Sequence, residues 1–271
     1  MAAKKILFIT TEITPYMHET EMSVIARQLP QGIHERGKEI RTFTPKFGII
    51  NERRNQLHEV IRLSGMNLII NETDHPLVIK VASIQAARMQ IYFIDNDDFF
   101  QRKYLLRDGS GNEFTDNDER SIFYVRGVME TVKKLKWIPD LIHCHGWMTA
   151  LAPLYIKKHY RGDPCFKNSK IIYSVYNDDF EQPFGKDFVR KLKIDGITPK
   201  DTAHIEKGAD FKSLSKVAID FSDGVIQGSS EIHPEVRQYA QQKGNIPFLD
   251  YQPEEVYIDA FNDFYDQILT K

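Results

Sequence analysis

Residues 139–158 read PDLIHCHGWMTALAPLYIKK, and this stretch decides the fold class. Its first part, Leu141–His145, is a short run rich in apolar residues of the kind that forms a buried strand. Its second part, Met148–Tyr160, predicts a helix because apolar side chains recur there at helical spacing. A strand that leads through a short turn into a helix is the unit from which parallel sheets are assembled.

The same alternation of strand and helix extends in both directions from this stretch. Lys5–Thr11 predicts a buried strand, and Met22–Glu35 predicts a helix that Pro30 should kink or interrupt. Further strands are expected at Ile40–Thr44, Leu68–Ile70, Leu77–Ser83, Met89–Ile94, Lys170–Val175 and Gly224–Gln227, and further helices at 116–134, Phe211–Phe221 and Pro234–Lys243. This order predicts an α/β domain over residues 1–252, with a mainly parallel sheet covered by helices on both faces.

The last residues, 253–271, predict a separate amphipathic helix. Tyr257, Phe261 and Phe264 share one face of it, and an acidic face lies opposite. We expect this helix to dock on the sheet through its aromatic face, and to cover surface that a second domain would otherwise touch.

Composition narrows the range of possible partners and cellular locations. The 271 residues contain 36 Lys and Arg against 38 Asp and Glu, a formal net charge of −2, which argues against nonspecific nucleic-acid binding. Cys144 and Cys165 are too few for a disulfide framework and fit a reducing compartment. The first apolar run, Ile6–Ile9, is too short for a signal peptide or a membrane span. We therefore expect a cytoplasmic protein without nucleic-acid or membrane partners.

Parallel sheets bind ligands at the carboxyl ends of their strands, so three loops carry the candidate site: 11–21, 145–147 and 176–186. The candidate ligand-binding residues in or beside these loops are Thr11, Glu12, Tyr16, His18, His143, His145, Trp147, Tyr176 and Asn177. Trp147 is expected in the core rather than as a stacking platform, and Tyr176 with Asn177 is either a sugar contact or an exposed turn.

A metal site is not expected. His143 and His145 lie two residues apart on one strand and share a face, but no third ligand follows at a recognisable spacing. The pair is interpreted as one packed and one cleft-facing histidine. No cofactor is predicted either.

Three segments resemble bacterial glycogen synthases and plant starch synthases. Residues 4–31 (KKILFITTEITPYMHETEMSVIARQLPQ) are similar to the opening of these enzymes, where a strand is followed by S-E-x-x-P, then K-x-G-G-L-A-D-V and A-L-P. Residues 139–158 resemble their P-D-(I/V)-(I/V)-H-x-H-D-W-x-x-(A/G)-L-A-P-x-Y segment. Residues 209–230 (ADFKSLSKVAIDFSDGVIQGSS) resemble their x-x-F-L-K-x-G-I-x-Y-A-D-x-V-x-x-V-S segment.

The resemblance implies one Rossmann-like half of a GT-B glycosyltransferase, the N-terminal acceptor-side domain. Such enzymes transfer glucose from ADP-glucose or a UDP sugar to an α-1,4-glucan and retain its configuration. The second, donor-side domain has no counterpart in these 271 residues.

Five positions depart from the family motifs. His18 stands at the donor-phosphate lysine, and Thr20 and Glu21 replace the two glycines that follow it. Gly146 replaces the aspartate of H-x-H-D-W, and Tyr176 replaces the histidine beside the transferred glucose. Glycine lets the backbone approach a phosphate closely, whereas a glutamate repels it. No catalytic residue is therefore assigned.

Three functions remain open. The first is a degenerate, non-catalytic relative that binds a glucan, a small sugar or a protein of glycogen metabolism. The second is an ADP-glucose-dependent α-1,4-glucan glucosyltransferase completed by a separate donor-domain subunit. The third is an interaction module that pairs with a second copy through its uncovered cleft face.

Overall fold

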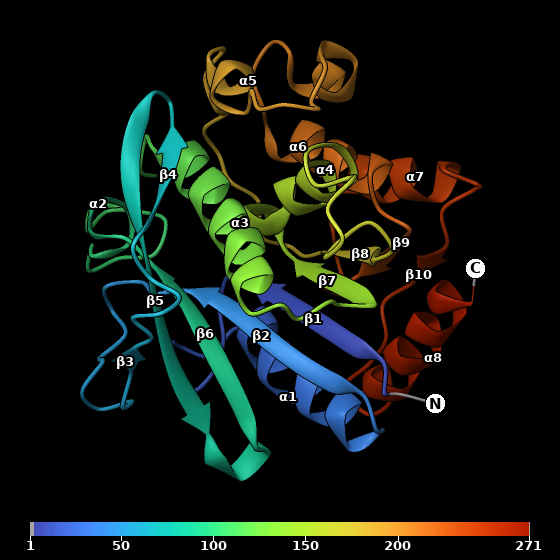
Figure 1. Ribbon diagram of the computed structural model, residues 1–271. Coiled ribbons are helices and arrows are strands. Elements are labelled where there is room, and N and C mark those ends of the chain that lie inside the picture. Colours follow the sequence, from blue (N-terminus) through green and yellow to red (C-terminus); the bar gives the residue numbers. More distant parts are fainter. Residues whose placement is uncertain (1–2, 271) are drawn as a thin grey trace.

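A computed structural model describes residues 3–270 and shows an α/β fold built on one sheet (Figure 1). The strands are β1 (Lys5–Thr10), β2 (Glu39–Pro45), β3 (His58–Glu59), β4 (Met66–Ile70), β5 (Thr73–Ile84), β6 (Met89–Asp95), β7 (Leu141–His145), β8 (Lys170–Val175), β9 (Gly224–Gln227) and β10 (Phe248–Leu249). Their order is β10-β9-β8-β7-β1-β2-β6-β5-β3, with β4 paired to β5. Neighbours from β10 to β6 are parallel, whereas β5 is antiparallel to β6.

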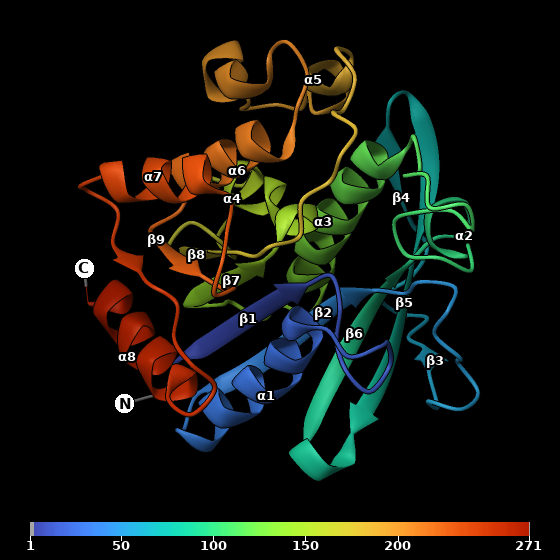
Figure 2. The same cartoon turned by 180° about the vertical axis from the view of Figure 1, so that it is seen from behind.

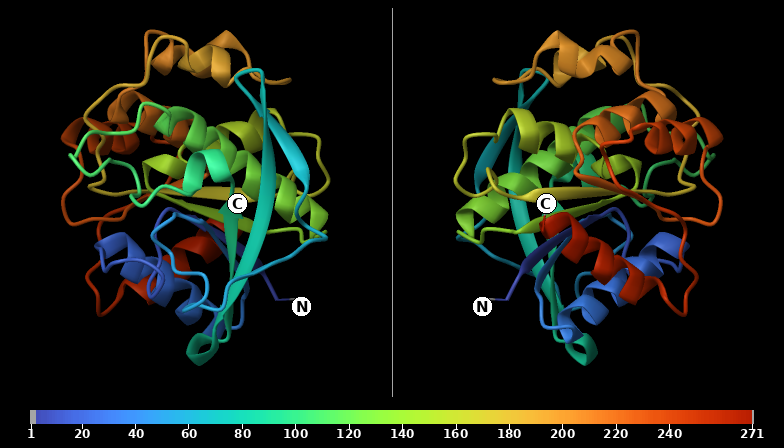
Figure 3. Two further views of the ribbon diagram at one scale, coloured as in Figure 1. Left: turned by 90° about the vertical axis from the view of Figure 1, so that its left-hand side faces the viewer. Right: turned by 90° about the vertical axis from the view of Figure 1, so that its right-hand side faces the viewer.

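Helices cover both faces of the sheet. They are α1 (Glu21–Glu35), α2 (Asp97–Phe100), α3 (Asn117–Lys134), α4 (Leu151–Lys158), α5 (Phe188–Lys191), α6 (Phe211–Asp220), α7 (Pro234–Gln242) and α8 (Tyr257–Leu269). Helices α1 and α8 lie side by side on one face, as Figure 2 shows, and α3, α4, α6 and α7 lie on the other (Figure 3). None of the helices within residues 3–270 is long and apolar enough to cross a membrane.

Alternation along the strands divides the core into two parts. On β1, Ile6 and Phe8 point into the cluster beneath α1 and α8, whereas Leu7 and Ile9 point into the larger cluster on the other face. All four side chains are buried. Both faces of this strand are therefore covered, which explains its continuous apolar sequence.

Helix α1 runs through Pro30 as one helix, so of the two effects expected of this proline, the interruption is wrong. A proline removes one backbone hydrogen bond, and here the buried neighbours Leu29 and Ile33 hold the helix against the sheet. The helix starts at a capping box, in which Thr20 accepts from the Ser23 N–H and Ser23 accepts from the Thr20 N–H.

Helix α8 docks through its aromatic face. Tyr257, Phe261 and Phe264 are buried in the cluster that also holds Ile6 and Phe8. At the far end of α1, Arg36 pairs with Asp259, and Lys38 pairs with Asp266 at 3.0 Å. The helix begins at Tyr257 rather than at 253, because residues before it form a turn closed by the Pro253 carbonyl.

One other expected helix differs in its bounds. The helix expected over Met148–Tyr160 begins as a 3₁₀ turn at Trp147–Thr149 and becomes α-helical at Leu151. Pro153 falls in the first turn of α4, where its missing N–H has no intrahelical partner to lose. The short elements α2, α5, β3 and β10 were not expected from the sequence.

Candidate functional site

The candidate site lies at the carboxyl ends of β1, β7, β8 and β9. The chain leaves β1 toward β2 on one side, and β7 pairs with β1 on the other. Such a change of direction opens a crevice above the strand ends in doubly wound sheets. The loop after β1, the turn after β7 and the loop after β8 meet there.

Carboxylates surround the start of α1. The Thr20 hydroxyl, besides capping the helix, donates to the Glu12 carboxylate at 2.6 Å. The Ser229 hydroxyl, just beyond β9, donates to the carboxylate of Glu21. Backbone N–H groups and the helix dipole make a helix start attractive to anions. Here two of the chain's own carboxylates lie beside the helix start, where they oppose the approach of an anion.

Ser229 also connects this helix to the loop after β8. Its Oγ accepts the Asn177 N–H at 3.1 Å while its hydroxyl donates to Glu21. Asn177 itself is exposed and faces a cavity of about 630 Å³ whose lining includes Asp179, His233 and Arg237. The ends of β8 and β9 are thus joined to α1 by one short polar chain.

Gly146 and Asp178 fit together after β7. Gly146 has φ +76° and ψ 173°, a conformation that is nearly confined to glycine. The Asp178 carboxylate lies where a Cβ at 146 would be, and it accepts the Trp147 N–H at 2.9 Å. An aspartate at 146, as in the family motif, would collide with this carboxylate.

Burial also sets the charge of Asp178. The residue as a whole is partly exposed, but its Oδ1 is buried and has no hydrogen-bond partner within residues 3–270. Burial raises the pKa of Asp178 to about 7, and the nearby carboxylates of Asp179 and Glu12 add to the rise. Asp178 thus differs from its exposed neighbours Asn177 and Asp179, because part of its carboxyl lies inside the fold.

Both histidines of β7 are buried, so the expectation that one faces the cleft is wrong. His143 is hydrogen-bonded to the hydroxyls of Tyr265 on α8 and Ser174 on β8, each at 2.6 Å. His145 lies 2.8 Å from the Tyr176 hydroxyl. Burial lowers the pKa of His143 well below its usual value and that of His145 to about 3, so both rings stay neutral. They are structural members of the sheet rather than a free acid–base pair.

Tyr176 is buried too, so it is not the exposed turn that was one of its two interpretations. Its ring packs on Gly228, where a Cβ would come within 2.8 Å of the ring. Together with the hydrogen bond to His145, this contact holds the phenol inside the crevice, where its ring fills space.

The remaining candidates separate into core and surface. Trp147 is 3% exposed and packs on Phe180, with ring centroids 4.9 Å apart, as expected of a core residue. Tyr16 packs edge-on against Phe93, and Thr11 is buried. His18 is exposed and faces a different cavity, beside Tyr104.

Within the described residues, 3–270, the structure contains no group of three or more His, Cys, Asp or Glu side chains arranged to hold a metal ion. Sequence reasoning did not identify Asp178, Ser229 or Tyr265 as residues of the site. The only available signal was position, because Asp178 and Ser229 each follow closely on a strand end.

Comparison with known proteins shows which proteins resemble this chain in sequence and fold. A family model described as "Starch synthase catalytic domain" matches residues 5–250. A glycogen synthase of Chlorobium luteolum is 36% identical over 174 residues, covering 64% of this chain and 36% of that protein. One of Chlorobaculum parvum is 32% identical over 267 residues, covering 98% of this chain and 52% of that protein.

A solved structure, the catalytic domain of starch synthase IV from Arabidopsis thaliana bound to ADP and acarbose, shares the fold. Its TM-score is 0.72 at 15% identity, covering 92% of this chain and 51% of that one. The chain therefore spans about half the length of this structure, and between about a third and about half of the two glycogen synthases.

Proposed function

Because the chain belongs to the starch synthase catalytic domain family, we propose that it is a glycogen synthase-like protein that binds an α-glucan or a small sugar without transferring glucose. The family, the α/β fold and the glycosyltransferase likeness are its premises. The absence of transfer and the nature of the ligand are the parts proposed.

The carboxylates at the start of α1 are the main support. The resemblance puts the donor phosphates at residues 18–21, where this chain has the exposed His18 and the Glu21 carboxylate held by Ser229. The Glu12 carboxylate is also held close by, through the Thr20 hydroxyl. A pyrophosphate would have to approach these negative charges without a lysine in the loop to offset them.

The filling of the crevice is a second support. At the position of the family's histidine beside the transferred glucose, the larger Tyr176 occupies the space with its ring against Gly228. Stabilising charge in a transition state needs groups aimed at the reacting atoms. A phenol bonded to a buried neutral histidine offers no charge of either sign.

Calorimetric titration with ADP-glucose and, in a parallel cell, with maltotriose tests the proposal. We expect heat from maltotriose and none from ADP-glucose. Binding of ADP-glucose would contradict the proposal and favour a glucosyltransferase completed by a donor-domain subunit. The absence of heat in both titrations would contradict sugar binding and favour a protein partner.

The Glu21→Gln variant is a useful companion in the same experiment. It removes one negative charge but keeps an oxygen that can accept from Ser229. If charge is what excludes the nucleotide sugar, the variant should bind ADP-glucose more strongly than the unmodified chain does. If the unmodified chain and the variant both bound ADP-glucose tightly and with equal affinity, electrostatic repulsion would no longer support the proposal.

A further inference from the structure

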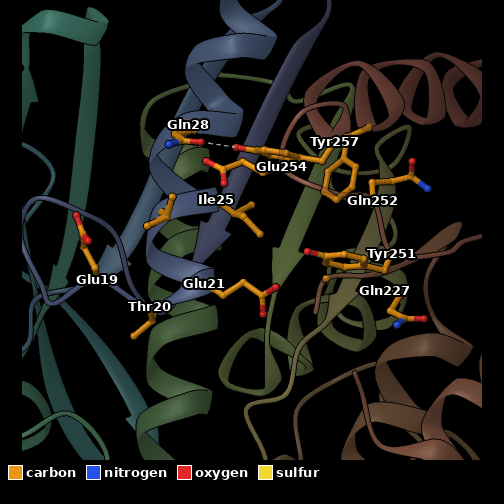
Figure 4. A pocket seen from close by; sticks show the side chains of 13 residues that line it. Glu19, Thr20, Glu21, Ile25, Gln28, Gln227, Tyr251, Gln252, Glu254 and Tyr257 are labelled. Atoms are coloured by element: carbon orange, nitrogen blue, oxygen red, sulfur yellow. Dashed lines mark hydrogen bonds between the residues drawn. The ribbon is translucent and has the colours of Figure 1, made fainter. Parts of the chain in front are cut away.

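A cavity of about 390 Å³ lies beside the crevice, between α1 and the segment that leads into α8. Its walls are the first two turns of α1, the end of β9 at Gly228, and residues 251–261 (Figure 4). This volume is in the range of small-ligand pockets. Of residues 18–21, where the resemblance puts the donor phosphates, Glu19, Thr20 and Glu21 line this cavity, whereas His18 lines the separate cavity beside Tyr104.

The polar groups of this cavity suit hydroxyls rather than phosphates. The carboxylates of Glu19, Glu21 and Glu254 can accept hydrogen bonds, and the described residues that line the cavity include no Lys, Arg or His. Within residues 3–270, Glu254 pairs with no cation, and the amide Nε2 of Gln28 has no acceptor. A sugar hydroxyl can donate to a carboxylate and accept from an amide, whereas a phosphate can only accept.

Aromatic rings complete the lining. Tyr257 and Phe261 are buried at the back, and Tyr251, 36% exposed, lies at the mouth. Figure 4 shows the Tyr251 ring between Glu21 and Gln227, on the opposite side of the cavity from Gln28. An exposed tyrosine face offers an apolar surface to the C–H groups of a sugar ring while its hydroxyl stays wet.

The cavity is held in shape by bonds that do not involve a ligand. The Tyr257 hydroxyl donates to Gln28 Oε1 at 3.0 Å, which fixes the orientation of the Gln28 amide. Burial, reinforced by the Glu254 carboxylate, raises the pKa of Tyr257 to about 12, so it remains a donor at neutral pH. Asp250, next to Tyr251, is anchored by Arg237 at 2.8 Å.

We propose that this cavity is a binding site for one or two units of an uncharged sugar, with Tyr251 as the stacking surface and Glu254 and Gln28 as hydroxyl partners. The inference rests on the proposed function, because it assigns that function a place and a ligand class. It extends beyond residues 18–21, since Tyr251, Glu254 and Tyr257 all come from the segment after β10.

The test compares two exposed tyrosines in the full chain. Tyr251→Ala removes the stacking surface, and Tyr104→Ala removes a tyrosine of similar exposure, 50%, from the separate cavity beside His18. Maltotriose affinity is measured by calorimetry. We expect Tyr251→Ala to weaken binding about tenfold, the usual scale for one aromatic contact, and Tyr104→Ala to leave it within about twofold. Equal thermal melting of both variants verifies folding.

A third variant separates a sugar from a cation. Glu254→Gln keeps an oxygen acceptor for a hydroxyl but loses the charge that an organic amine needs, so maltotriose affinity should stay within about threefold. Loss of affinity in Tyr104→Ala but not in Tyr251→Ala would overturn the site and leave sugar binding standing. Spermidine binding that Glu254→Gln abolishes, without maltotriose competition, would overturn the ligand class. No maltotriose binding by the unmodified chain would end both proposals.

Discussion

Replacing Asp178 by asparagine should change how the stability of the protein depends on pH. The pKa of this carboxyl is raised from 3.8 to about 7 in the folded protein, so the folded state holds a proton that the unfolded state releases. Its contribution to stability is complete below about pH 4 and is lost as the pH rises through 7. Asparagine can still accept the Trp147 N–H but does not titrate.

The size of the effect follows from the same pKa. Each pKa unit corresponds to about 1.4 kcal/mol, so the whole change is at most about 4 kcal/mol. Between pH 5 and pH 8, the unmodified chain should lose about 3 kcal/mol relative to Asp178→Asn. Partial access of solvent to the residue would reduce this figure, but the direction would not change.

Urea unfolding at pH 5, 6.5 and 8, followed by tryptophan fluorescence, measures the difference in free energy of unfolding between the two proteins. Asp263→Asn is the matched control, since it removes an exposed carboxyl on α8 that does not contribute to the raised pKa of Asp178. It should give a much smaller change with pH. Parallel curves for the unmodified chain and Asp178→Asn would refute a buried, protonated carboxyl beside Gly146.

Three other predictions concern packing. Gly146→Ala should lower the free energy of unfolding by about 2–5 kcal/mol, because it combines a strained backbone with displacement of Asp178 from the Trp147 N–H; a loss below about 1 kcal/mol in urea unfolding would be inconsistent with the geometry. Phe264→Ala should cost about 3–5 kcal/mol by the same assay, since its ring is buried between α8 and the sheet. Cys144 and Cys165 are buried and their pKa values are raised, so an aromatic disulfide reagent should label both only after denaturation; rapid labelling of the native protein would contradict this.

The central strands were predictable almost to the residue. Leu141–His145, Lys170–Val175 and Gly224–Gln227 coincide with β7, β8 and β9, because each is a short run rich in apolar residues and is bounded by turns. The two-residue strands β3 and β10 were not predictable, since two residues carry no periodicity. Their pairing depends on neighbouring strands rather than on their own side chains.

The site was predictable in position but not in detail. Strand-end loops around 11–21, 145–147 and 176–186 do meet, as the parallel arrangement requires. What their side chains do depends on distant partners, such as Tyr265, which contacts His143 from 122 positions away. The burial of His145 and Tyr176 likewise depends on tertiary contacts, which the local sequence does not reveal.

The pairing of Gly146 with Asp178 also bears on how this chain diverged from its relatives. Restoring an aspartate at 146 in a single step would set two carboxylates against each other in one small space and force glycine geometry on a residue that resists it. Positions 146 and 178 are therefore coupled, because a side chain at 146 needs the space that the Asp178 carboxylate occupies. Engineering that seeks to rebuild nucleotide-sugar binding here has to alter position 178 before, or together with, position 146.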